Sequence, residues 1–169
     1  MSEPDHPIVL HSVAGLLGRP VATDRILRAM LDRVVRELDA ERGTLYLVDG
    51  RSGELSTRVA HLPELPEIRM PPGRGVAGHV AETGESLVVP DAAGDPRFNP
   101  EIDRRTGYTT RSMVAVPVRD EDGAIRGVLQ VLNRRTGTFA EADLARLSTL
   151  AGQVAQALAQ TSLRPCGDR

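Results

Sequence analysis

The segment from Gly73 to Gly78, with the sequence Gly-Arg-Gly-Val-Ala-Gly, is the first part of the chain whose spacing suggests chemistry. It leads into a short apolar run that predicts a helix from Val76 to Thr83, ended by Gly84. The first N–H groups of a helix have no partner within it and lie at the positive end of its dipole. The start of this helix is therefore predicted to bind a phosphate through the backbone of Gly75, Val76 and Ala77.

The same glycines also fit the Gly-x-Gly-x-x-Gly pattern of dinucleotide-binding folds. That pattern requires a parallel strand-helix-strand unit with a full-length helix. Here Pro71 and Pro72 precede the glycines, the helix is only about two turns long, and no acidic strand end follows at the usual distance. A dinucleotide-dependent enzyme is kept as a remote alternative.

Side chains that could hold a metal or act as nucleophiles are few. The four histidines have no partner at metal-ligand spacing; His61 is predicted to be exposed in a turn and His79 to be solvated. Cys166 is the only cysteine, and all 21 basic side chains are arginine, which excludes Schiff-base chemistry on a lysine. We predict no metal site, no cofactor and no catalytic residue.

The composition sets the class of protein. A chain of 169 residues with 40% apolar residues and a net charge of -2 is expected to form one soluble globular domain. Its charges are interleaved, so no basic stripe is available for nucleic acid. Its apolar runs are far shorter than the about 20 residues needed to cross a bilayer, and residues 1–7 do not resemble a secretory signal. We expect a cytoplasmic protein without membrane or nucleic-acid partners.

Two long helices are predicted near the two ends of the sequence. Apolar residues at helical spacing predict the first from Thr23 to Ala40, with Thr23 as its N-cap. Thr138 and Glu141 have the spacing of a capping box, which predicts the start of a last helix that runs to about Gln160.

The last helix carries a regular apolar seam. Its members follow the a/d spacing of helices that lie nearly parallel: Leu144, Leu147, Ala151, Val154 and Leu158. This spacing predicts a homodimer built from the first and last helices. Packing within one chain is the alternative interpretation.

Strands are predicted from the turn sequences that join them. Two hairpins are expected, one from residues 44–49 and 54–60 and one from residues 113–119 and 125–133. Shorter strands are expected at residues 68–70 and 87–90. The segment between Pro90 and Met113 has little periodicity, and a loop of this length inside a compact domain is typical of a lid over a binding site.

This order of elements, together with several short motifs, resembles the GAF domain family. The matching motifs are Gly73 to Gly84, Pro90-Asp91-Ala92, Asp95-Pro96-Arg97-Phe98, Thr106-Gly107-Tyr108 and Gly127 to Asn133. They are similar to those of GAF domains in cyclic-nucleotide phosphodiesterases and bacterial adenylyl cyclases. The resemblance implies an α+β fold, a six-stranded antiparallel sheet sandwiched between helices. It assigns residues 16–160 to one domain, residues 1–15 to an N-terminal extension and residues 161–169 to a polar tail.

The resemblance also implies a ligand site for cAMP or cGMP. Thr44 falls where the family places a small hydroxyl residue near the base, and Gln130 falls where an acidic or amide group reads the ring. Asp103, Thr106 and Thr110 fall on lid positions that bind base or phosphate. The aromatic residue that stacks on the base in the family is missing near Ala60 and His61, which lowers the expected affinity because such stacking is worth about 1–3 kcal/mol.

A second implied feature is a clamp between the last strand and the last helix. Its residues are Asn133, Arg134, Phe139 and Asp143, which depart in part from the family pattern. Arg134 and Asp143 are predicted to form a bidentate ion pair that supports the ligand site without touching the ligand.

The function implied is that of a non-catalytic sensor. It would bind a small molecule and pass the signal through its homodimer to a downstream output. The main alternative is a GAF fold with a degenerate pocket that acts in dimerisation or protein interaction. The missing stacking residue favours this alternative, and the polar lid residues oppose it.

Overall fold

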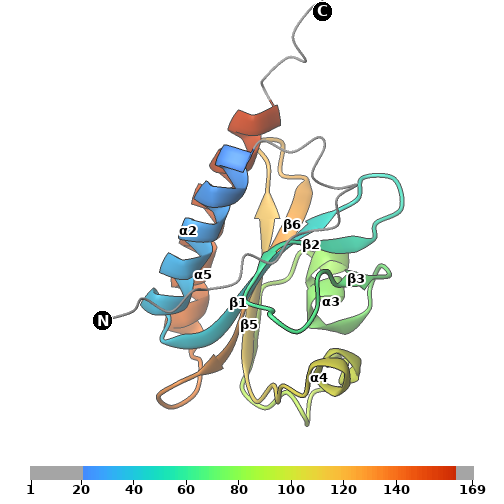
Figure 1. Cartoon of the computed structure of the whole chain (residues 1–169), viewed down its shortest axis with the longest axis vertical. Coiled ribbons are helices and arrows are strands. Elements are labelled where there is room, and N and C mark those ends of the chain that lie inside the picture. The colour runs from blue at the N-terminus through green and yellow to red at the C-terminus, as the bar shows by residue number, and fades with distance from the viewer. Residues whose placement is uncertain (1–20, 163–169) are drawn as a thin grey trace, which may run out of the picture.

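The computed structural model describes residues 21–162 (Figure 1). The predicted extension at residues 1–15, Cys166 and most of the predicted tail lie outside the described residues. The elements in chain order are α2 (Val21–Glu37), β1 (Ala40–Val48), β2 (Leu55–Ala60), β3 (Arg69–Met70), α3 (Gly75–Thr83), β4 (Leu87–Val89), α4 (Glu101–Thr106), β5 (Met113–Arg119), β6 (Ile125–Arg134) and α5 (Glu141–Ser162).

The strands form one six-stranded sheet in the order β3-β2-β1-β6-β5-β4. Every neighbouring pair is antiparallel. Both predicted hairpins are present, as β1–β2 and β5–β6, although β1 begins at Ala40, four residues before the predicted start at Thr44. The predicted α+β fold is confirmed.

The helices lie on both faces of the sheet (Figure 1). The long helices α2 and α5 cover one face, and the short helices α3 and α4 lie on the other. Each face has its own apolar core: Leu31, Leu129 and Leu147 belong to the first, and Tyr46, Val80 and Val128 to the second. The sheet therefore separates a layer of structural helices from a layer that contains the predicted ligand site.

Helix α2 packs very closely on β1 at Gly43. A Cβ atom at Gly43 would lie 2.8 Å from Cγ2 of Val35 and 2.9 Å from Cδ1 of Leu31, so only glycine fits there. The predicted N-cap Thr23 is wrong, because the helix already includes Val21. Thr23 is instead a buried residue within the first turn of the helix.

Helix α5 begins at Glu141, and Thr138 is exposed, so the predicted capping box is wrong. The carboxylate of Asp143 accepts a hydrogen bond from the Ala140 N–H at 2.8 Å, while the Ala140 carbonyl accepts from the Leu144 N–H at 3.3 Å. Asp143 therefore fills the third helical position, where an acidic side chain reaches back to the first free N–H. The predicted capping box took Glu141 as the acidic residue, but Asp143, two positions later, has that role. The helix therefore starts later than the spacing from Thr138 predicted.

The apolar seam of α5 is used inside the chain. Leu147, Ala151 and Val154 are buried in the core that α2 shares, and Leu144 and Leu158 pack against that core. Figure 1 shows α2 and α5 side by side and running in opposite directions. The a/d spacing that predicted a dimer seam thus fits the alternative interpretation, packing within one chain.

The segment between β4 and β5 contains a helix that the sequence pattern did not predict. This helix is α4, and Gly107 ends it in the left-handed region at a φ of 72°. The Gly107 N–H donates to the Asp103 carbonyl at 2.8 Å, which closes the last turn. The predicted irregular lid therefore has a rigid element at its centre.

Candidate functional site

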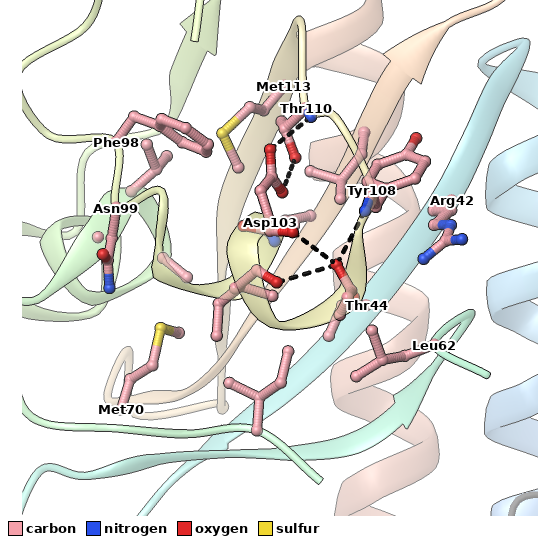
Figure 2. Close-up of a pocket in the computed structure, with 18 of the residues that line it drawn as sticks. Arg42, Thr44, Leu62, Met70, Phe98, Asn99, Asp103, Tyr108, Thr110 and Met113 are labelled. Atoms are coloured by element: carbon pink, nitrogen blue, oxygen red, sulfur yellow. Dashed lines mark hydrogen bonds between the residues drawn. The ribbon is translucent and has the colours of Figure 1, made fainter. Parts of the chain in front are cut away.

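A small cavity lies between the sheet and the segment that carries α4 (Figure 2). Its volume is about 60 Å³, the room of a few water molecules. Every residue predicted to contact a ligand lines it: Thr44, Gly75, Val76, Ala77, Asp103, Thr106, Thr110 and Gln130. Residues from five separate elements or loops therefore meet at one place.

The floor of the cavity is formed by the central strands β1 and β6. Thr44 lies directly opposite Gln130 in the strand pairing, and Tyr46 follows Thr44 on the same face of β1. The three residues are 6%, 6% and 3% exposed. Tyr46 was missed in the sequence analysis, although strand alternation places it on the same face as Thr44.

These floor residues have unused hydrogen-bonding capacity. Oε1 of Gln130 is buried without a partner, and the hydroxyls of Thr44 and Tyr46 make no hydrogen bond within residues 21–162. Burial raises the pKa of the Tyr46 phenol, so the hydroxyl stays protonated and able to donate. Since buried polar groups in folded proteins nearly always have a partner, the floor is suited to a polar ligand.

The lid residues, in contrast, are bonded to one another. The Asp103 carboxylate accepts from the Thr110 N–H at 2.6 Å and from the Thr110 hydroxyl at 2.8 Å (Figure 2). The Thr106 hydroxyl donates to the Ile102 carbonyl at 2.9 Å and accepts from the Tyr108 N–H at 3.2 Å. In this arrangement, therefore, the three predicted lid contacts hold the lid itself together.

The start of α3 offers free backbone donors, as predicted. The Gly78 N–H donates to the Arg74 carbonyl at 3.2 Å, so the N–H groups of Gly75, Val76 and Ala77 lie ahead of the first helical bond. No side chain caps this end. The dinucleotide-binding alternative is wrong, because α3 follows a strand of a sheet whose pairs are all antiparallel.

An arginine and a tyrosine lie at the edge of the cavity. The Arg42 guanidinium stacks on the Tyr108 ring, with Cζ 3.9 Å from the ring centroid (Figure 2). Arg42 also donates two hydrogen bonds to the Glu64 carboxylate, at 2.7 and 3.0 Å. Neither residue was predicted to line the site, although Tyr108 belongs to a matching motif, because the contact joins β1 to a segment more than sixty residues away.

His61 is not the exposed turn histidine that was predicted. Its Nδ1 accepts from the Gly43 N–H at 3.2 Å, and its Nε2 lies 2.7 Å from Oδ1 of Asp32 on α2. The packing of α2 against β2 brings this carboxylate to the ring and partly buries it. His79 keeps a partly exposed side chain, 3.4 Å from Glu85. The aromatic side chains that line the cavity are Tyr46, Phe98 and Tyr108, together with the ring of His61.

Asn133 joins the lid to the sheet. Its Oδ1 accepts from the N–H groups of Arg111 and Ser112 at 2.6 and 3.1 Å, and its Nδ2 donates to the Thr109 carbonyl and the Tyr108 hydroxyl, both at 2.8 Å. The residue is fully buried and adopts a φ of 54°, which asparagine tolerates better than most residues. Asn133 therefore holds the end of the lid segment in place.

The remaining clamp residues lie away from the cavity. Arg134 and Asp143 form an ion pair through Nη1 and Oδ2, a single contact rather than the predicted bidentate one. Nε of Arg134 is buried without a partner. Phe139 is buried in the core between α2, α5 and the sheet. These residues join β6 to α5 and do not line the cavity.

Within residues 21–162, no group of three or more His, Cys, Asp or Glu side chains is arranged to hold a metal ion. None of the helices in that range has both the length and the apolar character required to cross a bilayer.

Known proteins resemble this chain in sequence and in fold. The dual 3',5'-cyclic-AMP and -GMP phosphodiesterase 11 of Drosophila melanogaster is 39% identical over 148 residues, which cover 75% of this chain and 10% of that protein. The chain thus spans about a tenth of this relative's length. The corresponding phosphodiesterase 11A of Takifugu rubripes is 39% identical over 120 residues, which cover 63% of this chain and 13% of the relative.

A solved structure gives the same fold. The GAF domain of a phosphoenolpyruvate-protein phosphotransferase from Coxiella burnetii has a TM-score of 0.72 at 24% identity, covering 83% of this chain and 84% of that one. At this identity the likeness shows the fold alone. The GAF domain family itself matches residues 22–158 of the sequence. With the sheet order, the two helix layers and this match, the chain belongs to the GAF domain family.

Proposed function

We propose that this GAF domain is a non-catalytic sensor that binds a purine cyclic nucleotide, cAMP or cGMP, in the cavity under α4. The observation that carries the proposal is the cavity floor, where Oε1 of Gln130 is buried without a partner and the hydroxyls of Thr44 and Tyr46 make no hydrogen bond within residues 21–162. Sequence similarity to a phosphodiesterase named for both nucleotides supports the same ligand class.

The expected arrangement of the ligand follows from the chemistry of the lining. Free N–H groups at the start of α3 suit the single negative charge of a cyclic phosphate. The neutral floor residues Thr44 and Gln130 suit the base. A glutamine amide can both donate and accept, so Gln130 is compatible with adenine and with guanine.

The cavity must enlarge before a nucleotide can enter. Sites for small molecules usually have about 300–1,000 Å³, whereas this cavity has about 60 Å³. The bonds between Asp103 and Thr110 and those around Asn133 hold the lid in the closed arrangement. Binding would therefore shift the population toward an arrangement with the lid moved outward, and that shift is the signal.

We further propose that the signal passes to an output through a homodimer that uses the outer surface of α2. The apolar seam of α5 is occupied within the chain, so a partner would contact residues that α2 leaves exposed. Ile26 is 54% exposed and is the most prominent apolar group there. α2 also packs on β1 and β2, so a movement of the sheet would reach this surface.

A degenerate pocket is the second candidate function. Asp103 and Thr110 satisfy each other, so in this arrangement neither side chain is free for a ligand. In that case the domain would act only in dimerisation or protein interaction.

The experiment that separates the two candidates is a thermal melt with increasing cAMP, cGMP or 5'-AMP. A ligand that binds the folded state raises the melting temperature with its concentration by mass action. We expect one cyclic nucleotide to do so, and Gln130→Leu, which keeps the size but removes the amide, to abolish the effect. If neither cyclic nucleotide raises the melting temperature, the result supports the degenerate-pocket function instead.

A further inference from the structure

Tyr46 lies at the inner end of the cavity floor. Three side chains of β1 line the cavity, and their exposure falls along the strand: the Arg42 side chain is 20% exposed, Thr44 is 6% and Tyr46 is 3%. Arg42 lies at the edge, where it reaches Tyr108 and Glu64. The Tyr46 ring, in contrast, belongs to the apolar core beneath α3.

The hydroxyl of Tyr46 makes no hydrogen bond within residues 21–162, and its oxygen is not among the enclosed side-chain atoms without a partner, so it stays accessible although the residue as a whole is almost fully buried and lines the cavity. A phenylalanine would fill the same apolar space, so the packing of the core does not require the hydroxyl. A polar group kept in such a position calls for a partner that enters from outside the chain. The Tyr46 side chain lines the cavity.

We propose that the Tyr46 hydroxyl is a ligand-binding group that donates a hydrogen bond to a neutral acceptor on the base of the bound nucleotide. This inference rests on the proposed function. The floor around Tyr46 is neutral: Thr44 precedes it on the same face, and Gln130 faces Thr44 from β6. A ring nitrogen or carbonyl oxygen suits this environment, whereas the phosphate suits the start of α3.

The chain contains a matched control for this hydroxyl. Tyr46 and Tyr108 are its only two tyrosines, and both line the cavity. The Tyr108 hydroxyl donates to Glu41 at 2.7 Å and accepts from Asn133 at 2.8 Å. The two phenylalanine substitutions therefore remove the same atom, once from an unpartnered group and once from a partnered one.

The test compares Tyr46→Phe and Tyr108→Phe with the wild type, first without ligand. We expect Tyr46→Phe to keep or raise the melting temperature and Tyr108→Phe to lower it. Isothermal titration with the cyclic nucleotide that stabilises the wild type then measures the affinity. We expect about a five- to tenfold weaker affinity for Tyr46→Phe, from the net value of one hydrogen bond.

Tyrosine labelled with ¹³C at Cζ supplies a direct readout, because the spectrum holds only two signals and each substitution assigns one of them. Nucleotide should shift the Tyr46 signal. Unchanged affinity in Tyr46→Phe, or a lower melting temperature of its ligand-free form, would overturn the inference. The hydroxyl would then bind an ordered water molecule or stabilise the fold instead of binding the ligand. Absence of nucleotide binding by the wild type would instead overturn the proposed function, and this inference with it.

Discussion

The carboxylate of Asp103 accepts two hydrogen bonds from Thr110, one from the backbone N–H at 2.6 Å and one from the hydroxyl at 2.8 Å. Asp103 lies in α4, and Thr110 lies between α4 and β5, so the pair closes the lid segment on itself. Both residues line the cavity. A ligand that displaced either side chain from this contact would therefore change the conformation of the lid.

Replacing Asp103 by Asn should loosen the lid. The amide oxygen can still accept from the Thr110 N–H and the amide NH₂ can donate to the Thr110 hydroxyl, but both bonds lose the charge of the carboxylate and become weaker. We expect faster amide hydrogen exchange across residues 98–112 and a loss of about 1–2 kcal/mol in unfolding free energy. Asp122→Asn, in the exposed β5–β6 turn, is the control and should change neither. Unaltered exchange in the Asp103 variant would show that the pair does not hold the lid.

Replacing Asp143 by Ala should destabilise the fold. The side chain pairs with Arg134 and accepts the Ala140 N–H, and its loss leaves a partly buried guanidinium and a free helix-end donor. Urea unfolding should show a loss of about 2–3 kcal/mol. Glu141→Ala removes an exposed acid from the same helical turn and should cost much less. If the clamp also supports the ligand site, nucleotide affinity falls in Asp143→Ala at a temperature where the variant is folded.

Glu41 should make the stability sensitive to acid. Burial opposes ionisation of its carboxyl, but hydrogen bonds from Tyr108, Arg111 and Asn133 outweigh burial and hold its pKa below the ordinary 4.5. A lowered pKa in the folded state means that the carboxylate stabilises the fold above the unfolded pKa, and that this contribution is lost as the pH falls through the folded pKa.

The measurement is the unfolding free energy as a function of pH, for the wild type and for Glu41→Gln. We expect the two curves to be separated at neutral pH and to converge below the ordinary pKa of the carboxyl. Curves that stay parallel through the acid range would contradict a role for the ionised Glu41 in holding the lid.

Ile26 tests the proposed dimer. If the outer surface of α2 forms the interface, Ile26→Arg should convert a dimer to a monomer in light scattering coupled to gel filtration, because a buried unpaired charge is strongly unfavourable. Gln153→Arg, on the exposed surface of α5, should keep the wild-type mass. A wild-type chain that is monomeric at high concentration would contradict the dimer as a property of these residues.

Local sequence patterns were sufficient for most elements of this fold. The turn sequences predict the two hairpins, β1–β2 and β5–β6, and Gly84 after a short apolar run predicts α3. These features depend on backbone geometry and near neighbours, which the sequence records directly. The resemblance to the GAF family then predicted residues of the cavity, because each residue could be matched by its position within a short motif.

The partners of those residues required the tertiary structure. The sequence shows that α5 has an apolar stripe, but not whether the stripe faces another chain or its own sheet. In the same way it contains His61 and Asp32, or Asp103 and Thr110, without indicating that they are paired. The sequence shows Tyr46 only as a residue of a predicted strand, and the tertiary structure shows that it lines the cavity. Periodicity records which side of an element is buried, whereas the identity of the neighbour depends on how distant elements pack.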